Sequence, residues 1–108
     1  MPWLPQPSSW AELSVSAQAG DPSSTLSLYR TALRLRREHL GPEGLVWHSA
    51  PGDDVLVFDR PVAGGTLRCA INQGTSPVSI VDATPLVASA PMAPDGHLPP
   101  DTAAWWRL

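Results

Sequence analysis

General acid–base catalysis depends on positioned carboxyl groups, so the acidic residues are the first candidates for chemistry in this sequence. The sequence holds ten of them, and only Asp53 and Asp54 are adjacent. This pair follows Pro51-Gly52, a dipeptide typical of turns. Neighbouring residues on a turn usually point apart, and no recognisable motif surrounds them. We interpret the pair as a solvated hairpin turn and predict that the chain contains no catalytic residue.

The remaining reactive side chains are isolated along the sequence. His39, His48 and His97 are far apart, so a metal site built from closely spaced ligands is not expected. Cys69 is the only cysteine, which excludes an internal disulfide, and its apolar neighbours predict a small core residue. No nucleophile elbow or phosphate-binding glycine loop is present, since Gly64-Gly65 reads as a turn. We predict no metal and no cofactor.

The tryptophans admit two interpretations. Aromatic rings can stack against sugar rings, but they also bury large apolar areas in small cores. Successive residues of a strand point to opposite faces, so at least one of Trp105 and Trp106 can be exposed. We expect Trp47 and one member of that pair to lie in the core.

One long helix is predicted over residues 21–40. Asp21 is a suitable N-cap, Pro22 suits the first helical position and Gly41-Pro42 provides a stop. The apolar residues form a wide stripe along this helix: Leu26, Tyr29 and Leu33, broadened by Leu28, Ala32 and Leu35. So wide a stripe must be buried against something sizeable, which suggests that part of its packing partner lies outside this chain.

Short strands are predicted after the helix, within residues 44–108. The Gly64-Gly65 turn predicts a hairpin, and the close spacing of strands and turns indicates an antiparallel sheet or sandwich. The candidate strands are Leu45–Trp47, Val55–Phe58, Leu67–Ile71, Val78–Val81, Leu86–Ala88 and Ala103–Leu108. The predicted fold is mainly β, preceded by one long helix and by an extended segment with a short turn around Ala11-Glu12-Leu13.

Composition and charge narrow the function classes. With 43% hydrophobic and 16% charged residues, the chain is too apolar for a disordered protein. A net charge of −3 gives no electrostatic basis for nucleic-acid binding. The seven basic residues are all arginines, and four lie on the predicted helix, where we interpret them as stabilising its C-terminal end. No segment could span a membrane and no targeting signal is evident, so we expect a soluble cytoplasmic protein with no nucleic-acid or membrane partner.

The order of these motifs resembles the C-terminal portion of an α-glucosidase of the α-amylase superfamily, glycoside hydrolase family 13. In the first part of the chain, the matching positions are Trp3, Pro5, Pro7, Gln18, Asp21, Pro22, Ser24, Leu26, Tyr29, Arg30, Leu33, Arg36 and Arg37. Later matching features are an apolar strand ending in Asn72, the stretch Leu86–Ser89, and Leu98-Pro99-Pro100 before the last strand.

This resemblance implies a division into three parts. Residues 1–20 would be a Pro/Trp-rich lead-in, residues 21–43 the last helix of a catalytic β/α barrel, and residues 44–108 a C-terminal antiparallel β-domain. The family implies retaining hydrolysis of terminal α-linked glucose, but its two catalytic carboxylates precede the helix and have no counterparts here. We therefore expect a non-catalytic accessory domain that stabilises the barrel, with Trp3 and Trp10 packed against the barrel.

Two other functions remain open: a free-standing carbohydrate-binding module for α-glucan oligosaccharides, and a subunit that docks onto a separately encoded barrel. The barrel partner could thus be supplied in cis or in trans. The residues expected to have structural or interface roles are Trp3, Leu26, Tyr29, Leu33, Trp47 and Trp106. The sequence assigns no substrate-binding residue. Without a barrel, the helix residues of this set would be only partly covered.

Overall fold

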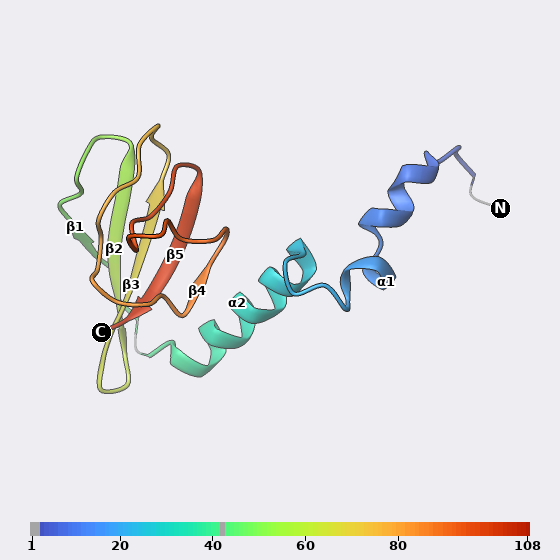
Figure 1. The fold of residues 1–108 in the computed structure, drawn as a ribbon. Coiled ribbons are helices and arrows are strands. Elements are labelled where there is room, and N and C mark those ends of the chain that lie inside the picture. The colour runs from blue at the N-terminus through green and yellow to red at the C-terminus, as the bar shows by residue number, and fades with distance from the viewer. Residues whose placement is uncertain (1–2, 42) are drawn as a thin grey trace.

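The computed structural model describes residues 3–41 and 43–108, which form a helical arm leading into a single sheet. The arm consists of the 3-10 helix η1 (Ser8–Leu13), the short α1 (Val15–Gln18) and the long α2 (Thr25–His39). Figure 1 shows η1 and α1 extending away from the sheet, with α2 between them and the strands. The lead-in that was expected to be extended is thus helical over η1 and α1 but not over residues 3–7, and the short turn expected at Ala11–Leu13 is the end of η1.

The sheet has five antiparallel strands in the order β1-β2-β3-β5-β4. Their bounds are β1 Val46–His48, β2 Val55–Val62, β3 Gly65–Asn72, β4 Val87–Ala88 and β5 Thr102–Arg107. The predicted β2–β3 hairpin is confirmed, with Val62 paired to Gly65 across the turn. Gly64 has a φ of 73°, a conformation in which glycine avoids the Cβ clash that other residues meet. The mainly β prediction is confirmed.

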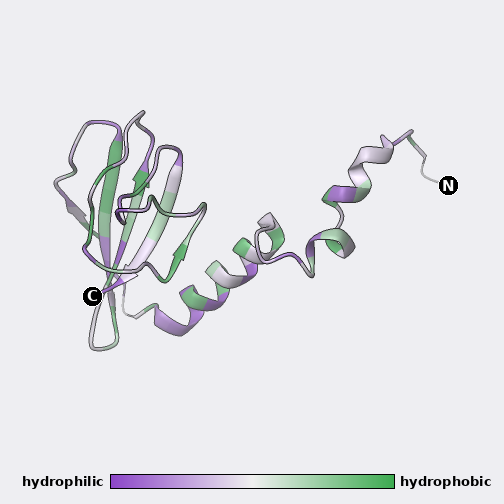
Figure 2. Ribbon diagram, in the orientation of Figure 1, coloured by the Kyte–Doolittle hydropathy of each residue, from purple (hydrophilic) through white to green (hydrophobic). Residues whose placement is uncertain are grey.

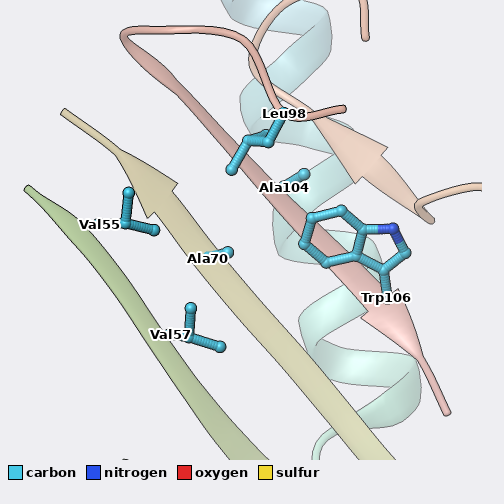
Figure 3. Packing of buried hydrophobic residues seen from close by; sticks show 6 residues of the cluster. All are labelled: Val55, Val57, Ala70, Leu98, Ala104 and Trp106. Atoms are coloured by element: carbon cyan, nitrogen blue, oxygen red, sulfur yellow. The ribbon is translucent and has the colours of Figure 1, made fainter. Parts of the chain in front are cut away.

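The main core lies on one face of the sheet. Figure 3 shows Val55 and Val57 of β2, Ala70 of β3, and Ala104 and Trp106 of β5 gathered with Leu98. Trp106 is 1% exposed, and its indole Nε1 donates to Ala83 O at 3.1 Å, so its one polar atom is satisfied. This confirms that one of the two terminal tryptophans is a core residue.

The covering layer is a long connection, not a second sheet. Val78, Ile80, Val81 and Met92 from the segment between β3 and β5 pack onto the core. The predicted strand Val78–Val81 is wrong, because only Val78 pairs, in a single bridge with Leu98. Apart from β4, this connection is irregular, so Val78, Ile80, Val81 and Met92 pack on the core without forming a strand.

Asn72, at the end of β3, attaches this covering layer to the sheet. Its side chain is 0% exposed. Its Nδ2 donates to Ser76 O at 2.9 Å and to Leu98 O at 3.0 Å, and its Oδ1 accepts from Gly74 N at 2.9 Å. One amide thus holds both ends of the connection, and the burial of a polar group is compensated by three hydrogen bonds.

The start of α2 differs from the prediction. Ser24 is the N-cap, and its Oγ accepts from Ser27 N at 3.2 Å. The expected cap, Asp21, instead accepts from Ser23 N at 2.9 Å within a preceding turn. The residues predicted as the first helical turn therefore form that turn, and the helix begins at Thr25.

The end of α2 is attached to the β2–β3 hairpin. Leu40 forms a bridge with Val62, and Gly41 N donates to Pro61 O at 3.2 Å. A Cβ on Gly41 would lie 2.9 Å from Val62 Cα, closer than van der Waals contact allows, so a glycine is required for this approach.

Candidate docking surface

One side of α2 faces the sheet. Leu35 is buried, and Leu28 and Ala32 are half-buried. A hollow of about 210 Å³ lies between α2 and the strands β4 and β5, with Val87 and Trp105 among its lining residues. Leu28 and Ala32 of the predicted stripe therefore face the sheet across this hollow.

The opposite side of α2 is open. Tyr29 is 63% exposed and Leu33 is 57% exposed, while Leu26 is half-buried. At 3.6 residues per turn, Leu26 and Leu33 lie roughly opposite Leu28 and Leu35 around the helix. Tyr29 lies at the edge between the two sides, since it is largely exposed and also lines the hollow beside the sheet. We call Leu26, Tyr29 and Leu33 the outer stripe. Figure 2 shows hydrophobic segments alternating with hydrophilic ones along α2.

Arginines border the outer stripe. Arg30, Arg36 and Arg37 are exposed, and none forms a salt bridge within the part of the chain that the structure describes. Arg34 differs, since its guanidinium lies 3.3 Å from Glu38. Arg36 and Arg37 occupy the last turn, where cations complement the helix dipole.

The arm adds further uncovered apolar side chains. Trp3 is 92% exposed, and Trp10 is also largely exposed. Both line one hollow of about 700 Å³ formed by residues of the lead-in. Gln18 connects the arm to α2: its Nε2 donates to Leu13 O at 2.6 Å, and its Oε1 accepts from Leu26 N at 2.9 Å. The exposed groups of arm and helix therefore belong to one connected segment.

The prediction that Trp47 lies in the core is wrong. Trp47 is 62% exposed because β1 is a three-residue edge strand. Its ring contacts Phe58 of β2 edge to face, with centroids 5.4 Å apart and an interplanar angle of 62°. The two rings are not coplanar, so they do not form the flat platform on which a sugar ring stacks.

A polar cluster that the sequence did not reveal joins three strands. Asp59 of β2 accepts from Arg68 of β3 at 2.8 and 3.0 Å, and His48 Nε2 of β1 lies 2.7 Å from the same carboxylate. The hydrogen bonds from Arg68 hold the pKa of Asp59 below its usual range, outweighing the opposite effect of burial. The register of the predicted hairpin could have revealed this pair, because pairing Val62 with Gly65 also places Asp59 opposite Arg68.

This cluster attaches the edge strand β1 to the rest of the sheet, and we interpret it as a structural ion pair and not as a catalytic site. Arg68 satisfies the carboxylate with a two-pronged contact. Among the described residues, no group of three histidine, cysteine or acidic side chains could hold a metal ion. None of the helices so described is long and apolar enough to cross a membrane.

The adjacent carboxylates, Asp53 and Asp54, lie in the turn between β1 and β2, and both are exposed. The carbonyl of Asp54 accepts from Gln73 N at 2.8 Å. The Asp54 carboxylate lies against Gly74, where a Cβ would clash with Oδ2. The contacts of Asp54 thus join the turn to the end of β3.

Comparison with known proteins places this fold. No family model and no curated protein matches the chain. Among solved structures, the trehalulose synthase MutB from Pseudomonas mesoacidophila MX-45 is 24% identical with a TM-score of 0.71, over 98% of this chain and 22% of that enzyme. A MutB variant from crystals soaked with trehalulose gives a TM-score of 0.73 at 24% identity, covering 100% and 22% of the two chains. A variant in complex with its substrate sucrose gives 0.72 at 25% identity, covering 98% and 22%.

The chain thus spans 22% of the length of these enzymes. MutB is an enzyme of glycoside hydrolase family 13, so the expected resemblance to the α-amylase superfamily is confirmed. The similarity includes the helical arm as well as the sheet, since it covers 98% or more of the chain.

Proposed function

We propose that the chain acts as the last barrel helix and accessory β-domain of a glycoside hydrolase, held against a catalytic β/α barrel and inert as a catalyst by itself. The observation that supports this most directly is the match over 98–100% of the chain to 22% of a family 13 enzyme. The outer stripe provides the physical support, because a barrel would cover side chains that are exposed here.

Covering the outer stripe has a sizeable free-energy benefit. Full burial of a large apolar side chain stabilises by about 1.5–3 kcal/mol, and Tyr29 and Leu33 are each more than half exposed. Docking of these two residues alone would therefore contribute roughly 2–3 kcal/mol to the association. The role proposed for the domain is to fix α2 in place and so to stabilise the barrel.

The proposed lack of activity follows from what retaining hydrolysis requires. Such enzymes use a nucleophile and an acid/base carboxylate about 5–5.5 Å apart. Among the described residues, the carboxylates of Asp59 and Glu38 are paired with arginines, and Asp54 packs on a glycine. We propose that both catalytic groups come from the barrel. The parent enzyme would act on small α-glucosides, as MutB, with sucrose as its substrate, does.

The test has two parts. The purified chain should give no turnover of a chromogenic α-glucoside under conditions where MutB, as positive control, is active. The chain should also bind MutB from which the matched region has been deleted, as measured by analytical ultracentrifugation. Hydrolysis that co-purifies with the chain and is lost on its immunodepletion would refute the proposed inertness, and failure to bind any barrel of the family would refute the docking role.

Sugar binding is a second candidate, favoured by one observation. Trp3 and Trp10 are exposed and line the same hollow of the arm. Maltooligosaccharides should then quench tryptophan fluorescence, and a Trp10→Ala variant should lose this response. If tryptophan fluorescence does not change at about millimolar sugar, a concentration at which weak binding is detectable, the sugar-binding function is refuted and only the docking function remains.

A further inference from the structure

We infer that the outer stripe of α2 docks onto a protein surface that is apolar at its centre and bordered by carboxylates. This inference rests on the proposed docking function and specifies the chemistry of the partner. It follows from the charges that surround Leu26, Tyr29 and Leu33.

The bordering charges lie on both sides of the stripe. With a rotation of about 100° per residue, Arg30 and Arg37 fall on one side of the stripe and Arg36 on the other. All three are exposed and form no salt bridge within the described ranges 3–41 and 43–108. Covering the stripe would bring each guanidinium close to the partner and remove part of its hydration, which is unfavourable unless carboxylates pair with it.

The charge of the helix supports the same conclusion. The segment Thr25–His39 contains four arginines and one glutamate, a net charge of +3, within a chain whose net charge is −3. The glutamate, Glu38, already pairs with Arg34. The helix therefore offers no free carboxylate to neutralise the bordering arginines, and the partner must supply the negative groups.

Two other binding partners for the outer stripe, a second copy of this chain and an anionic membrane, fit these charges less well. If the outer stripes of two copies paired, the arginines of both helices would gather along one seam without carboxylates, and like charges repel. An anionic membrane would attract arginines, but the stripe contains only three apolar side chains and one of them, Leu26, is half-buried. Interfacial helices bury a larger apolar face. An acidic protein surface satisfies both the apolar and the charged groups.

The experiment uses the full chain and two synthetic helical peptides as probes. One peptide carries a leucine stripe bordered by glutamates, and the other replaces the glutamates by lysines. Fluorescence anisotropy would be measured at about 20 mM and about 500 mM salt, conditions that differ severalfold in Debye length. We expect the glutamate peptide to bind, with weaker binding at high salt, and the lysine peptide not to bind.

Variants identify the groups responsible. The triple change Arg30→Gln, Arg36→Gln and Arg37→Gln should weaken binding of the glutamate peptide about tenfold, since three exposed ion pairs of ordinary strength are lost. The three corresponding Arg→Lys changes should retain most of the affinity. Arg34→Gln is the matched control, because this arginine is paired with Glu38, and it should leave binding within about twofold. Circular dichroism would confirm that each variant keeps its helix.

Several results would overturn the inference. These are equal binding of the two peptides, salt-independent binding, no effect of the triple variant, or binding to phosphatidylserine vesicles without binding to the glutamate peptide. Self-association abolished by Leu33→Glu would identify a second copy as the occupant and would also refute it. If the barrel binds but the triple variant binds it equally well, this inference fails while the proposed function stands. If no barrel binds, the proposed function fails.

Discussion

Replacing Asn72 by alanine should be among the most destabilising single changes in the sheet. The substitution removes three hydrogen bonds that connect β3 to both ends of the covering layer. It leaves the partner groups without the side chain that satisfied them. The effect should therefore be large even though the change removes no apolar group.

The magnitude follows from the surroundings of each partner. The bond to Leu98 O is buried, so its loss leaves an unsatisfied carbonyl at a cost of about 1–3 kcal/mol. The bonds to Ser76 O and Gly74 N are partly buried, and water can replace the side chain there. These two contribute about 0.5–1 kcal/mol each. The expected decrease in the free energy of unfolding is thus about 3 kcal/mol, a large share of the roughly 5–15 kcal/mol typical of a domain.

Urea unfolding followed by tryptophan fluorescence would measure this decrease. Gln73→Ala is the control, because Gln73 is exposed and contributes a backbone hydrogen bond, which the variant retains. It should change stability by less than about 0.5 kcal/mol. A loss below about 1 kcal/mol for Asn72→Ala, with an unchanged m-value, would refute the reasoning, because it would mean that the covering layer is held by apolar contacts alone.

Three further predictions concern groups whose surroundings differ sharply. Trp106→Ala should destabilise the chain by about 3–5 kcal/mol, whereas Trp47→Ala, at an exposed edge, should cost less than about 1 kcal/mol; the same urea assay tests both. The pKa of Asp59 is lowered in the folded state by Arg68, so its stabilising contribution is present above its ordinary pKa of 3.8 and is lost as the pH falls through the lower folded value. The unfolding free energy should therefore decrease on acidification below about pH 5, and the Asp59→Asn variant should show a flatter profile. Burial raises the pKa of the Cys69 thiol to about 11, so a disulfide reagent at about pH 8 should react slowly with the folded chain and rapidly in urea; a fast reaction of the native chain would contradict this.

Local patterns in the sequence were sufficient for much of the fold. The Gly64-Gly65 turn predicted the β2–β3 hairpin because turn chemistry fixes both the loop and the register of its strands. The burial of one terminal tryptophan followed from the alternation of side chains along a strand. These features depend on interactions between residues that are close in the sequence, so local patterns are enough to predict them.

Other features depend on contacts between residues that are distant in the sequence. Asp21 and Ser24 are both suitable caps, and Ser24 prevails in a structure where Gln18 also accepts from Leu26 N. The residue type of Trp47 predicts a core position, but its strand lies at the sheet edge, a position that depends on the whole topology. The cluster around Asp59 required knowledge of which strands are neighbours.

The residues of the outer stripe, too, could be predicted only in part from the sequence. The apolar pattern of the helix was visible in the sequence, and its width indicated an absent partner. Which residues face outward depends on the position of α2 against β4 and β5, because Leu28 lines the hollow beside these strands, whereas Leu33 does not and stays exposed. Tyr29 lines the edge of the same hollow but is still largely exposed. The partner's chemistry depends in turn on that exposure, since only outward arginines can contact another protein.

The attachment at Gly41 has a mechanical consequence. A helix held at one point can pivot, but α2 contacts the sheet both at Leu40-Gly41 and along β4, so its direction is fixed as well as its position. We expect the helix and the sheet to move as one rigid body. A tilt of the sheet would then be transmitted to the protein that covers the outer stripe. Adding a side chain at Gly41 would weaken the contact at Leu40-Gly41 and leave α2 held only along β4, so that the helix could pivot relative to the sheet. Faster amide exchange at Leu40 and Gly41 would reveal this change.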